Sequence, residues 1–238
     1  MTPPTALTEH DPRERILRAA VELLSAAGRD AVSTRAVSAA AGVQPPTIYR
    51  HFGDMRRLVD AAASRGMADY LQEKRSRPHE DDPVDDLRAG WDLHVNFGVT
   101  RPHIYTVLYG DPRPGEEPRG VAEGNAILRG LLQRIAVAGR LRVEVDHAAE
   151  MVHSGCRGVA LTLIATPPAE RDLQLSTAVR EALLAAVTTD SPDRDDGKGL
   201  VPRAIALKAA IEASPPSALS SAEATMFLEW LNRLLQGD

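Results

Sequence analysis

The chain has 238 residues, of which 43% are hydrophobic, 26% charged and 4% aromatic. This composition supports one large or two small globular domains with an aliphatic core, and 17 Gly and 17 Pro are too few for a fibrous or disordered chain. A net charge of −5 argues against a protein that coats nucleic acid over its whole surface, and a single cysteine, Cys156, excludes an intrachain disulfide framework. Because neither a signal peptide nor a membrane-length apolar run is found, the sequence predicts a soluble, cytoplasmic protein.

The charge is unevenly distributed along the chain. Residues 1–77 contain 12 Lys and Arg against 9 Asp and Glu, a net charge of +3. Residues 78–238 contain 16 Lys and Arg against 24 Asp and Glu, a net charge of −8. This asymmetry indicates that the first part meets an anion and that the second does not.

Apolar residues recur at helical spacing in nearly every segment, and no strand pattern or internal repeat is found. At the N-terminal end, Ser33, Gln44 and Asp54 stand where helix caps belong, and glycines follow the apolar stripes. We therefore expect helices over residues 13–27, 33–41 and 45–52, and a longer helix that Asp54 caps and that extends to about Met67.

A charged, proline-containing segment over residues 76–83 lacks periodicity, which is typical of a connector between domains; a solvated loop inside one domain is the alternative. Beyond it, the spacing predicts polar loops at 110–118 and 189–199 and further helices over 84–100, 102–110, 119–138, 146–166, 176–188, 201–213 and 220–236. The sequence thus predicts an all-α fold with two domains. These are an N-terminal three-helix domain of residues 1–75, including a disordered arm of about residues 1–11, and a larger helical bundle of residues 76–238.

Residues 33–58 contain a short helix, a tight Gly42 turn and a second short helix, the order of a helix-turn-helix. The small core where the two helices cross is expected to contain Val37, Ala40, Val43, Ile48 and Phe52. The second helix then presents its outer face to solvent, and its N-terminal amides favour phosphate. Asp54 is the only acid between residues 31 and 59, which also hold Arg35, Arg50, Arg56 and Arg57. This local positive charge is the sign that DNA binding requires.

Three segments, ERILRAAVELLSAAG, STRAVSAAAGV and PPTIYRHFGDMRRLVDA, resemble the TetR family of bacterial transcription regulators over about residues 12–70. The resemblance implies a repressor that binds a palindromic DNA operator as a homodimer and leaves it when a small molecule binds. Met55 stands where family members often carry a Lys that contacts the DNA backbone, so Arg56 or Arg57 is a candidate to replace it. The DNA-binding residues implied by the resemblance are Arg35, Gln44, Pro45, Pro46, Thr47, Tyr49, Arg50, His51 and Arg56.

The larger domain is expected to supply a dimer interface and an effector pocket. One short recognition helix buries too little surface for tight binding, so a dimer would place two of them about 34–36 Å apart in successive major grooves. Candidates for the dimer interface are Leu161, Ile164, Leu183, Val187, Leu228 and Leu231, although the helix around 150–165 can instead form the core of the monomer. Candidates for the effector pocket are Trp91, His94, Phe97, Tyr105, Tyr109, Met151 and His153. The lack of a charged cluster favours an uncharged or largely apolar effector.

No enzyme motif of the G-x-S-x-G, Walker A or H-E-x-x-H type is found. The sequence reads E-x-x-H at Glu144–His147 and again at Glu150–His153, the spacing of di-iron bundles, but both copies lie in one segment rather than on two helices. We therefore expect no enzymatic activity, cofactor or metal site. Two alternatives stay open: a helical interaction protein that has lost DNA binding, and a metal-responsive regulator using His94, His103, His153 or Cys156.

Overall fold

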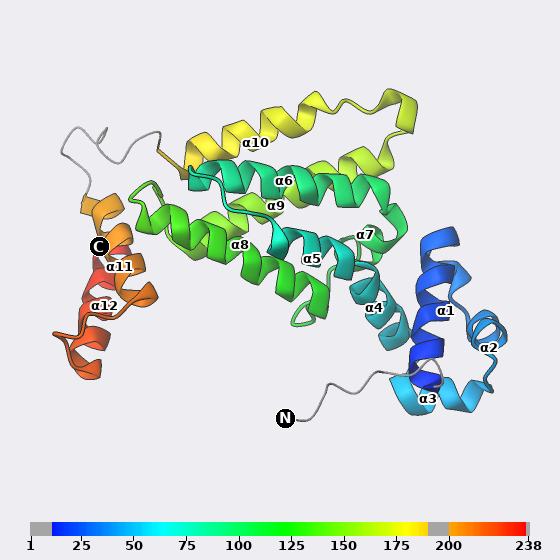
Figure 1. The fold of residues 1–238 in the computed structure, drawn as a ribbon. Coiled ribbons are helices and arrows are strands. Elements are labelled where there is room, and N and C mark those ends of the chain that lie inside the picture. The colour runs from blue at the N-terminus through cyan, green and yellow to red at the C-terminus, as the bar shows by residue number, and fades with distance from the viewer. Residues whose placement is uncertain (1–10, 190–199, 237–238) are drawn as a thin grey trace. The chain divides into compact units, whose positions relative to one another are not determined.

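The structure, a computed structural model, describes residues 11–189 and 200–236. Within these residues the chain forms twelve α-helices, two short 3-10 helices and no strand, which confirms the all-α prediction (Figure 1). The predicted N-terminal arm, apart from Asp11, lies outside the described residues, as does the predicted loop 189–199, apart from Thr189. No helix in the described part of the chain is long and apolar enough to cross a bilayer.

The N-terminal helices begin and end close to their predicted caps. The Ser33 hydroxyl accepts a hydrogen bond from the Ala36 amide at 3.2 Å, and the Asp54 carboxylate accepts one from the Arg57 amide at 2.8 Å. The predicted helix from Asp54 to Met67 and the residues after it form two helices, because the chain bends at Met67. The elements are α1 (Pro12–Ala27), η1 (Arg29–Ala31), α2 (Thr34–Ala41), α3 (Pro45–Phe52), α4 (Met55–Gly66) and α5 (Ala68–Ser76).

The later helices also lie within two residues of their predicted bounds. They are α6 (Pro83–Thr100), α7 (Pro102–Tyr109), α8 (Arg119–Val137), α9 (Val145–Ala165), α10 (Gln174–Val187), α11 (Leu200–Ala213) and α12 (Ser221–Gln236), with a 3-10 turn, η2 (Pro168–Glu170), between α9 and α10. Proline opens α6 and α7, where its missing amide proton costs no helical hydrogen bond.

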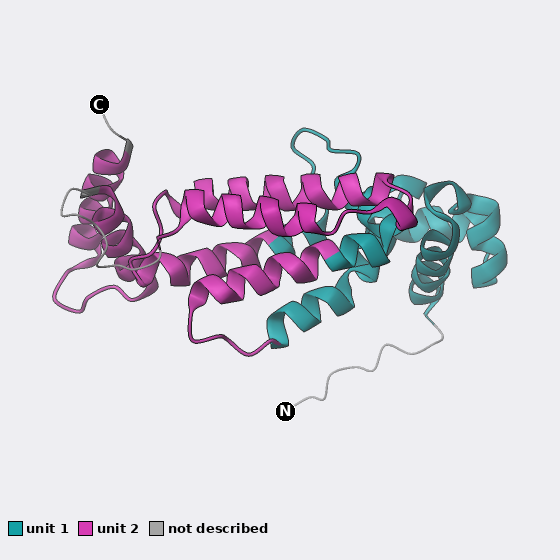
Figure 2. Cartoon of the chain, turned by 90° about the horizontal axis from the view of Figure 1, so that it is seen from above, with its two compact units in different colours: residues 1–76, 96–124 teal, residues 77–95, 125–238 magenta. Residues whose placement is uncertain are grey.

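The chain divides into two compact units, residues 1–76 with 96–124 and residues 77–95 with 125–238 (Figure 2). In the first unit, α1 packs against α2, α4 and α7, and α7 also packs against α4. The contact between α4 and α7 is close: a Cβ atom added to Gly66 would lie 2.5 Å from Cδ1 of the buried Ile104. The helix α7 and the loop after it therefore belong to the same unit as the helix-turn-helix.

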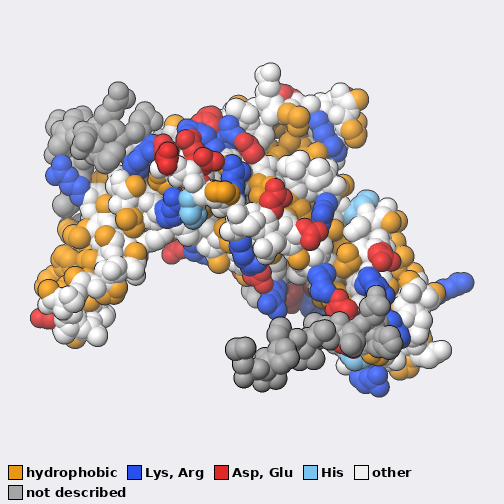
Figure 3. Space-filling view, viewed as in Figure 1, with side chains coloured by type: hydrophobic (Ala, Val, Ile, Leu, Met, Phe, Trp, Pro, Cys, Tyr) orange, Lys and Arg blue, Asp and Glu red, His pale blue; other side chains and the backbone are white. Residues whose placement is uncertain are grey.

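In the second unit, α9 packs against α10, and Trp91 of α6 is 3% exposed with its indole N–H donated to the Ser176 hydroxyl at 3.0 Å. The carboxylate of Asp86 is buried and accepts hydrogen bonds from Arg134 and from the Glu80 amide. The last two helices pack on one another around Ala204, Ile211 and Leu231. Hydrophobic surface gathers over α11 and α12 (Figure 3), where Val201, Leu207, Met226, Trp230 and Leu234 are exposed.

Candidate nucleic-acid interface

The helix-turn-helix consists of α2, the Gly42 turn and α3. Gly42 has φ +63°, a left-handed conformation that suits a residue without Cβ, and its amide closes α2 by donating to the Ser38 carbonyl. Val37 and Ile48 are fully buried and Phe52 is 8% exposed, so they hold the two helices together. Ala40, which was expected in this core, is exposed, because it lies on the outer side of α2.

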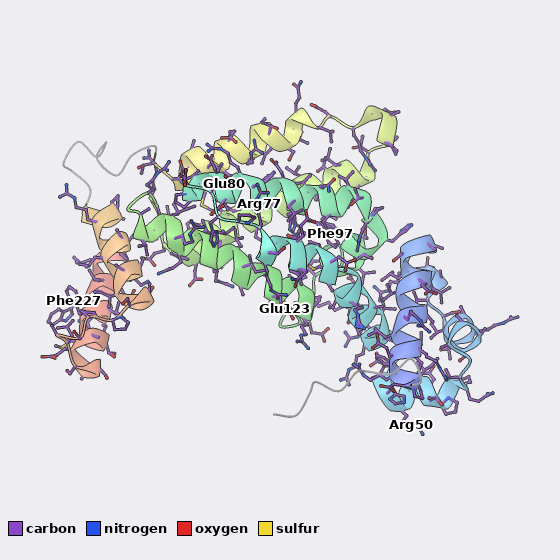
Figure 4. The ribbon with its side chains drawn as sticks, in the orientation of Figure 1. Arg50, Arg77, Glu80, Phe97, Glu123 and Phe227 are labelled. Carbon is purple, nitrogen blue, oxygen red and sulfur yellow. The ribbon has the colours of Figure 1, made fainter. Side chains whose placement is uncertain are left out.

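The outer face of α3 is open to solvent. Gln44, Pro45, Pro46, Tyr49 and Arg50 are exposed, and Arg50 projects away from the other helices of its unit (Figure 4). Among the described residues, no carboxylate lies within ion-pair distance of Arg50. This face therefore presents a cation that no carboxylate of residues 11–189 and 200–236 neutralises.

The expectation that free amides at the start of α3 favour phosphate is wrong. The first two helical residues, Pro45 and Pro46, have no amide proton, and the Thr47 amide donates to the Gln44 carbonyl at 2.9 Å. The amides at the start of α3 are therefore either missing or already bonded. Polar contacts at this tip have to come from the side chains of Gln44 and Thr47 rather than from an amide cradle.

Tyr49 joins α3 to the first turn of α2. Its hydroxyl lies 3.0 Å from Oγ1 of Thr34, and the side chain remains 45% exposed. The exposed Arg35 follows Thr34, and Ser33 caps the same helix end. Two hydroxyls thus lie together at the start of α2, and Arg35 follows next in the chain. Thr34 was not among the predicted site residues, since nothing in the sequence signals a hydrogen bond to a residue fifteen positions away.

His51 and Arg56 are arranged differently from the other predicted residues. The Nε2 atom of His51 is buried and has no hydrogen-bond partner among the described residues. Arg56, the second residue of α4, donates to both carboxylate oxygens of Glu116, at 2.7 and 3.5 Å. Its neighbour Arg57 is 70% exposed and lies 3.7 Å from the Asp54 carboxylate.

The seven residues predicted to line an effector pocket fall into two sets. In the first unit, Phe97 stacks on Tyr70 with ring centroids 4.7 Å apart, and Tyr105 lies 6.0 Å from Phe97 and 4.5 Å from Tyr109. In the second unit lie Trp91, His94, Met151 and His153, with the two histidine rings 6.4 Å apart. The structure thus brings together the three aromatic residues of the first set and, in the second set, the two histidines.

Two clefts in the first unit have volumes of about 690 and 990 Å³. One lies along α1, α4 and α7, and the other along α4, α5 and the loop before α8. Neither is lined by any of the seven predicted effector residues. No group of three or more His, Cys, Asp or Glu suited to a metal ion is found in residues 11–189 and 200–236.

The residues predicted for the dimer interface differ in burial. Val187 and Leu231 are buried in their own unit, and Leu228 packs against the cluster between α11 and α12. Leu161, Ile164 and Leu183 are half-buried on α9 and α10.

Comparison with known proteins agrees with the geometry of α2 and α3. Residues 16–62 match the family model of bacterial regulatory proteins, tetR family. The chain is 37% identical over 70 residues to the tetracycline repressor protein class C of Escherichia coli, covering 29% of this chain and 31% of that protein. It is 39% identical over 67 residues to the class A repressor from transposon 1721, covering 28% and 30%. The matches thus span about a third of the length of these curated relatives.

About three quarters of the chain has counterparts of similar fold among solved structures. The fatty acid degradation regulator FadR from Bacillus halodurans has a TM-score of 0.55 at 19% identity, covering 74% of this chain and 96% of that one. A tetR family transcription regulator from Shewanella sp. PV-4 has a TM-score of 0.57 at 17% identity, covering 76% and 100%. At such identities the likeness is one of fold. The match over residues 16–62 shows that the N-terminal region of this chain is similar to the bacterial regulatory proteins of the tetR family.

Proposed function

We propose that this protein is a TetR-like transcription regulator, a repressor that binds a palindromic operator as a homodimer. The observation that carries the proposal is the outer face of α3, which is exposed, basic and held rigidly by the buried side chains of Ile48 and Phe52. A short helix mounted in this way fits the major groove of B-DNA. The matched relatives, which are named tetracycline repressor proteins, support repression as the mode of control.

The exposed groups divide into two sets by chemistry. At the start of α2, the Thr34 and Tyr49 hydroxyls and the Arg35 guanidinium would bind one phosphate, because hydroxyl and guanidinium donors suit phosphate oxygens. At the tip and face of α3, Gln44, Thr47 and Arg50 would reach base edges, with Pro45 and Pro46 contributing apolar contact to thymine methyl groups. His51, whose Nε2 is buried, would support α3 from its inner side.

The regulator would act as a pair of copies and respond to a small effector. Two α3 helices about 34–36 Å apart would read the two half-sites of a palindrome. An effector would release DNA only if it binds a different arrangement of these helices better than the DNA-bound one. The lack of a charged cluster in the sequence of the larger domain favours an uncharged or largely apolar compound.

Selection of bound duplexes from a random pool tests the DNA-binding function, followed by anisotropy titrations of the enriched duplex at several salt concentrations. Arg50→Ala is expected to weaken binding by about tenfold and, where Arg50 meets a phosphate, to reduce the salt slope by about one. Tyr49→Phe should have a smaller effect in the same direction. Arg203→Ala, which removes an exposed arginine from α11, is the matched control and should leave affinity unchanged.

Failure to enrich any duplex, or equal affinity of Arg50→Ala and the unmodified protein, would exclude the proposed function. Screening metabolite extracts for release of the enriched duplex then tests the effector. If no extract changes the affinity, the chain is a DNA-binding protein without the proposed sensing step.

A further inference from the structure

The loop between α7 and α8 carries a chain of alternating charges toward the helix-turn-helix. Asp111 lies 3.3 Å from Arg29 and 2.7 Å from Arg113, and Arg113 lies 3.7 Å from Glu116. The Glu116 carboxylate in turn accepts hydrogen bonds from both terminal nitrogens of the Arg56 guanidinium. All five residues belong to the first compact unit. The loop thus contacts the chain just after α1 through Arg29 and the first turn of α4 through Arg56.

Arg56 occupies a position that bears directly on DNA binding. It lies three residues after Gly53, which ends α3, and so follows the candidate recognition helix closely. In the structure, however, its guanidinium is turned to Glu116 rather than left open like that of Arg50. The side chains of Arg56 and Glu116 are 40% and 54% exposed, so solvent and a competing anion can reach both.

A carboxylate and a phosphate offer the guanidinium fork the same pair of oxygen acceptors. Exposed ion pairs contribute little net stability, so exchanging one such partner for another costs little. Glu116 would not be left without a cation after the exchange, because Arg113 is also within ion-pair distance and is itself anchored by Asp111. The loop can therefore release Arg56 without losing its own charge balance.

We propose that Glu116 is an intramolecular competitor of DNA phosphate for Arg56. In the free protein Glu116 holds the guanidinium, and in the complex a backbone phosphate takes it over. This inference rests on the proposed function and adds a regulatory element to it: the loop lowers the affinity for DNA in general, so that weak, non-specific sites retain the protein less. Binding strength is then set partly by a residue of the loop, outside the helix-turn-helix.

A double-mutant cycle tests the competition. The full-length chain is prepared unmodified and as Glu116→Gln, Arg56→Gln and the double variant, with thermal melting curves to confirm folding. On the duplex enriched from the random pool, Glu116→Gln is expected to tighten binding by about three- to fivefold, because Gln neutralises the competitor at nearly constant shape. Arg56→Gln should weaken binding by a similar factor, and the double variant should bind like Arg56→Gln alone.

The neighbouring Glu117→Gln is the control for charge, since it removes the same unit of negative charge from the same loop. If Glu117→Gln tightens binding as much as Glu116→Gln, or if Glu116→Gln still tightens binding without Arg56, the effect is general electrostatic attraction and the proposal fails. It also fails if Glu116→Gln weakens binding, because Glu116 would then orient Arg56 for DNA rather than withhold it.

Elution of the same four proteins from heparin-agarose separates this proposal from the proposed function, since a sulfated polyanion needs no operator. Glu116→Gln is expected to elute at higher salt than the unmodified protein, and the difference should vanish in the Arg56→Gln background. If no duplex is enriched but this pattern holds, the operator-binding function is wrong and the competition is right. If a duplex is enriched but heparin and DNA both show no dependence on Glu116, the competition is wrong and the function stands.

Discussion

Gly66 is the last residue of α4, at the closest approach between α4 and α7. A Cβ atom there would lie 2.5 Å from Cδ1 and 3.3 Å from Cγ1 of Ile104, which is 2% exposed. Ordinary contacts of a Cβ atom begin near 3.4 Å, so Gly66→Ala requires the two helices or the Ile104 side chain to shift by about 1 Å.

Overpacking of this kind costs about 1–3 kcal/mol. The higher helix propensity of Ala returns up to about 1 kcal/mol, and less at a helix end. We therefore expect Gly66→Ala to lower the free energy of unfolding by about 1–2 kcal/mol. The measurement is urea unfolding followed by far-ultraviolet circular dichroism.

Two further variants make the reasoning testable. Ile104→Val removes Cδ1, the atom that the new methyl group meets, so the double variant should be more stable than the sum of the two single effects predicts. Gly124→Ala is the matched control in the same unit, because its Cβ would lie 3.5 Å from Met67, an ordinary contact. A Gly66→Ala protein as stable as the unmodified one, or strictly additive effects with Ile104→Val, would refute the close-contact argument.

Three other variants test separate features by thermal or urea unfolding. At Gly42, where φ is +63° and a Cβ would meet nothing within 4 Å, Ala should cost about 1 kcal/mol and Asn less; equal costs would contradict a conformational cause. Burial raises the pKa of Asp60 above 3.8, although Arg113, Arg56 and Arg29 oppose the shift. The folded state therefore holds the carboxyl proton of Asp60 more tightly than the unfolded state does. As the pH rises from the unfolded pKa to the higher folded pKa, the free energy of unfolding falls. Asp60→Asn should therefore gain melting temperature relative to the unmodified protein as the pH rises above 3.8, and a difference that stays constant with pH would contradict this. Ser176→Ala leaves the buried Trp91 indole N–H unpaired and should cost about 1–3 kcal/mol, whereas an unchanged unfolding midpoint would show that the hydrogen bond contributes nothing.

Helix bounds were predictable because their signals are local. Ser33 and Asp54 cap the helices that follow them, and Pro102 opens α7, as the residue types alone indicate. The helix expected after Asp54 ends at about Met67, close to the end of α4 at Gly66. The helix α5 (Ala68–Ser76) was not predicted, because only Tyr70 and Leu71 of its residues are buried and its sequence carries no clear apolar stripe.

The candidate site was only partly predictable, because its contacts join residues far apart in sequence. The exposure of Arg50 follows from the amphipathic spacing of α3. The pairing of Arg56 with Glu116, sixty residues away, depends on how the loop after α7 packs, which no periodicity records. The burial of His51 Nε2 was not predicted either, because helical spacing places a residue on a face of the helix and does not show which of its atoms are buried.

The two tryptophans of the chain lie in opposite surroundings. Trp91 is buried with its indole N–H bonded to a hydroxyl, whereas Trp230 on α12 is 51% exposed. Intrinsic fluorescence of the unmodified protein therefore mixes a blue-shifted emitter with a red-shifted one that aqueous quenchers reach. Replacing Trp230 by Phe would leave a single-emitter protein whose spectrum reports on the interior around α6 without any attached dye.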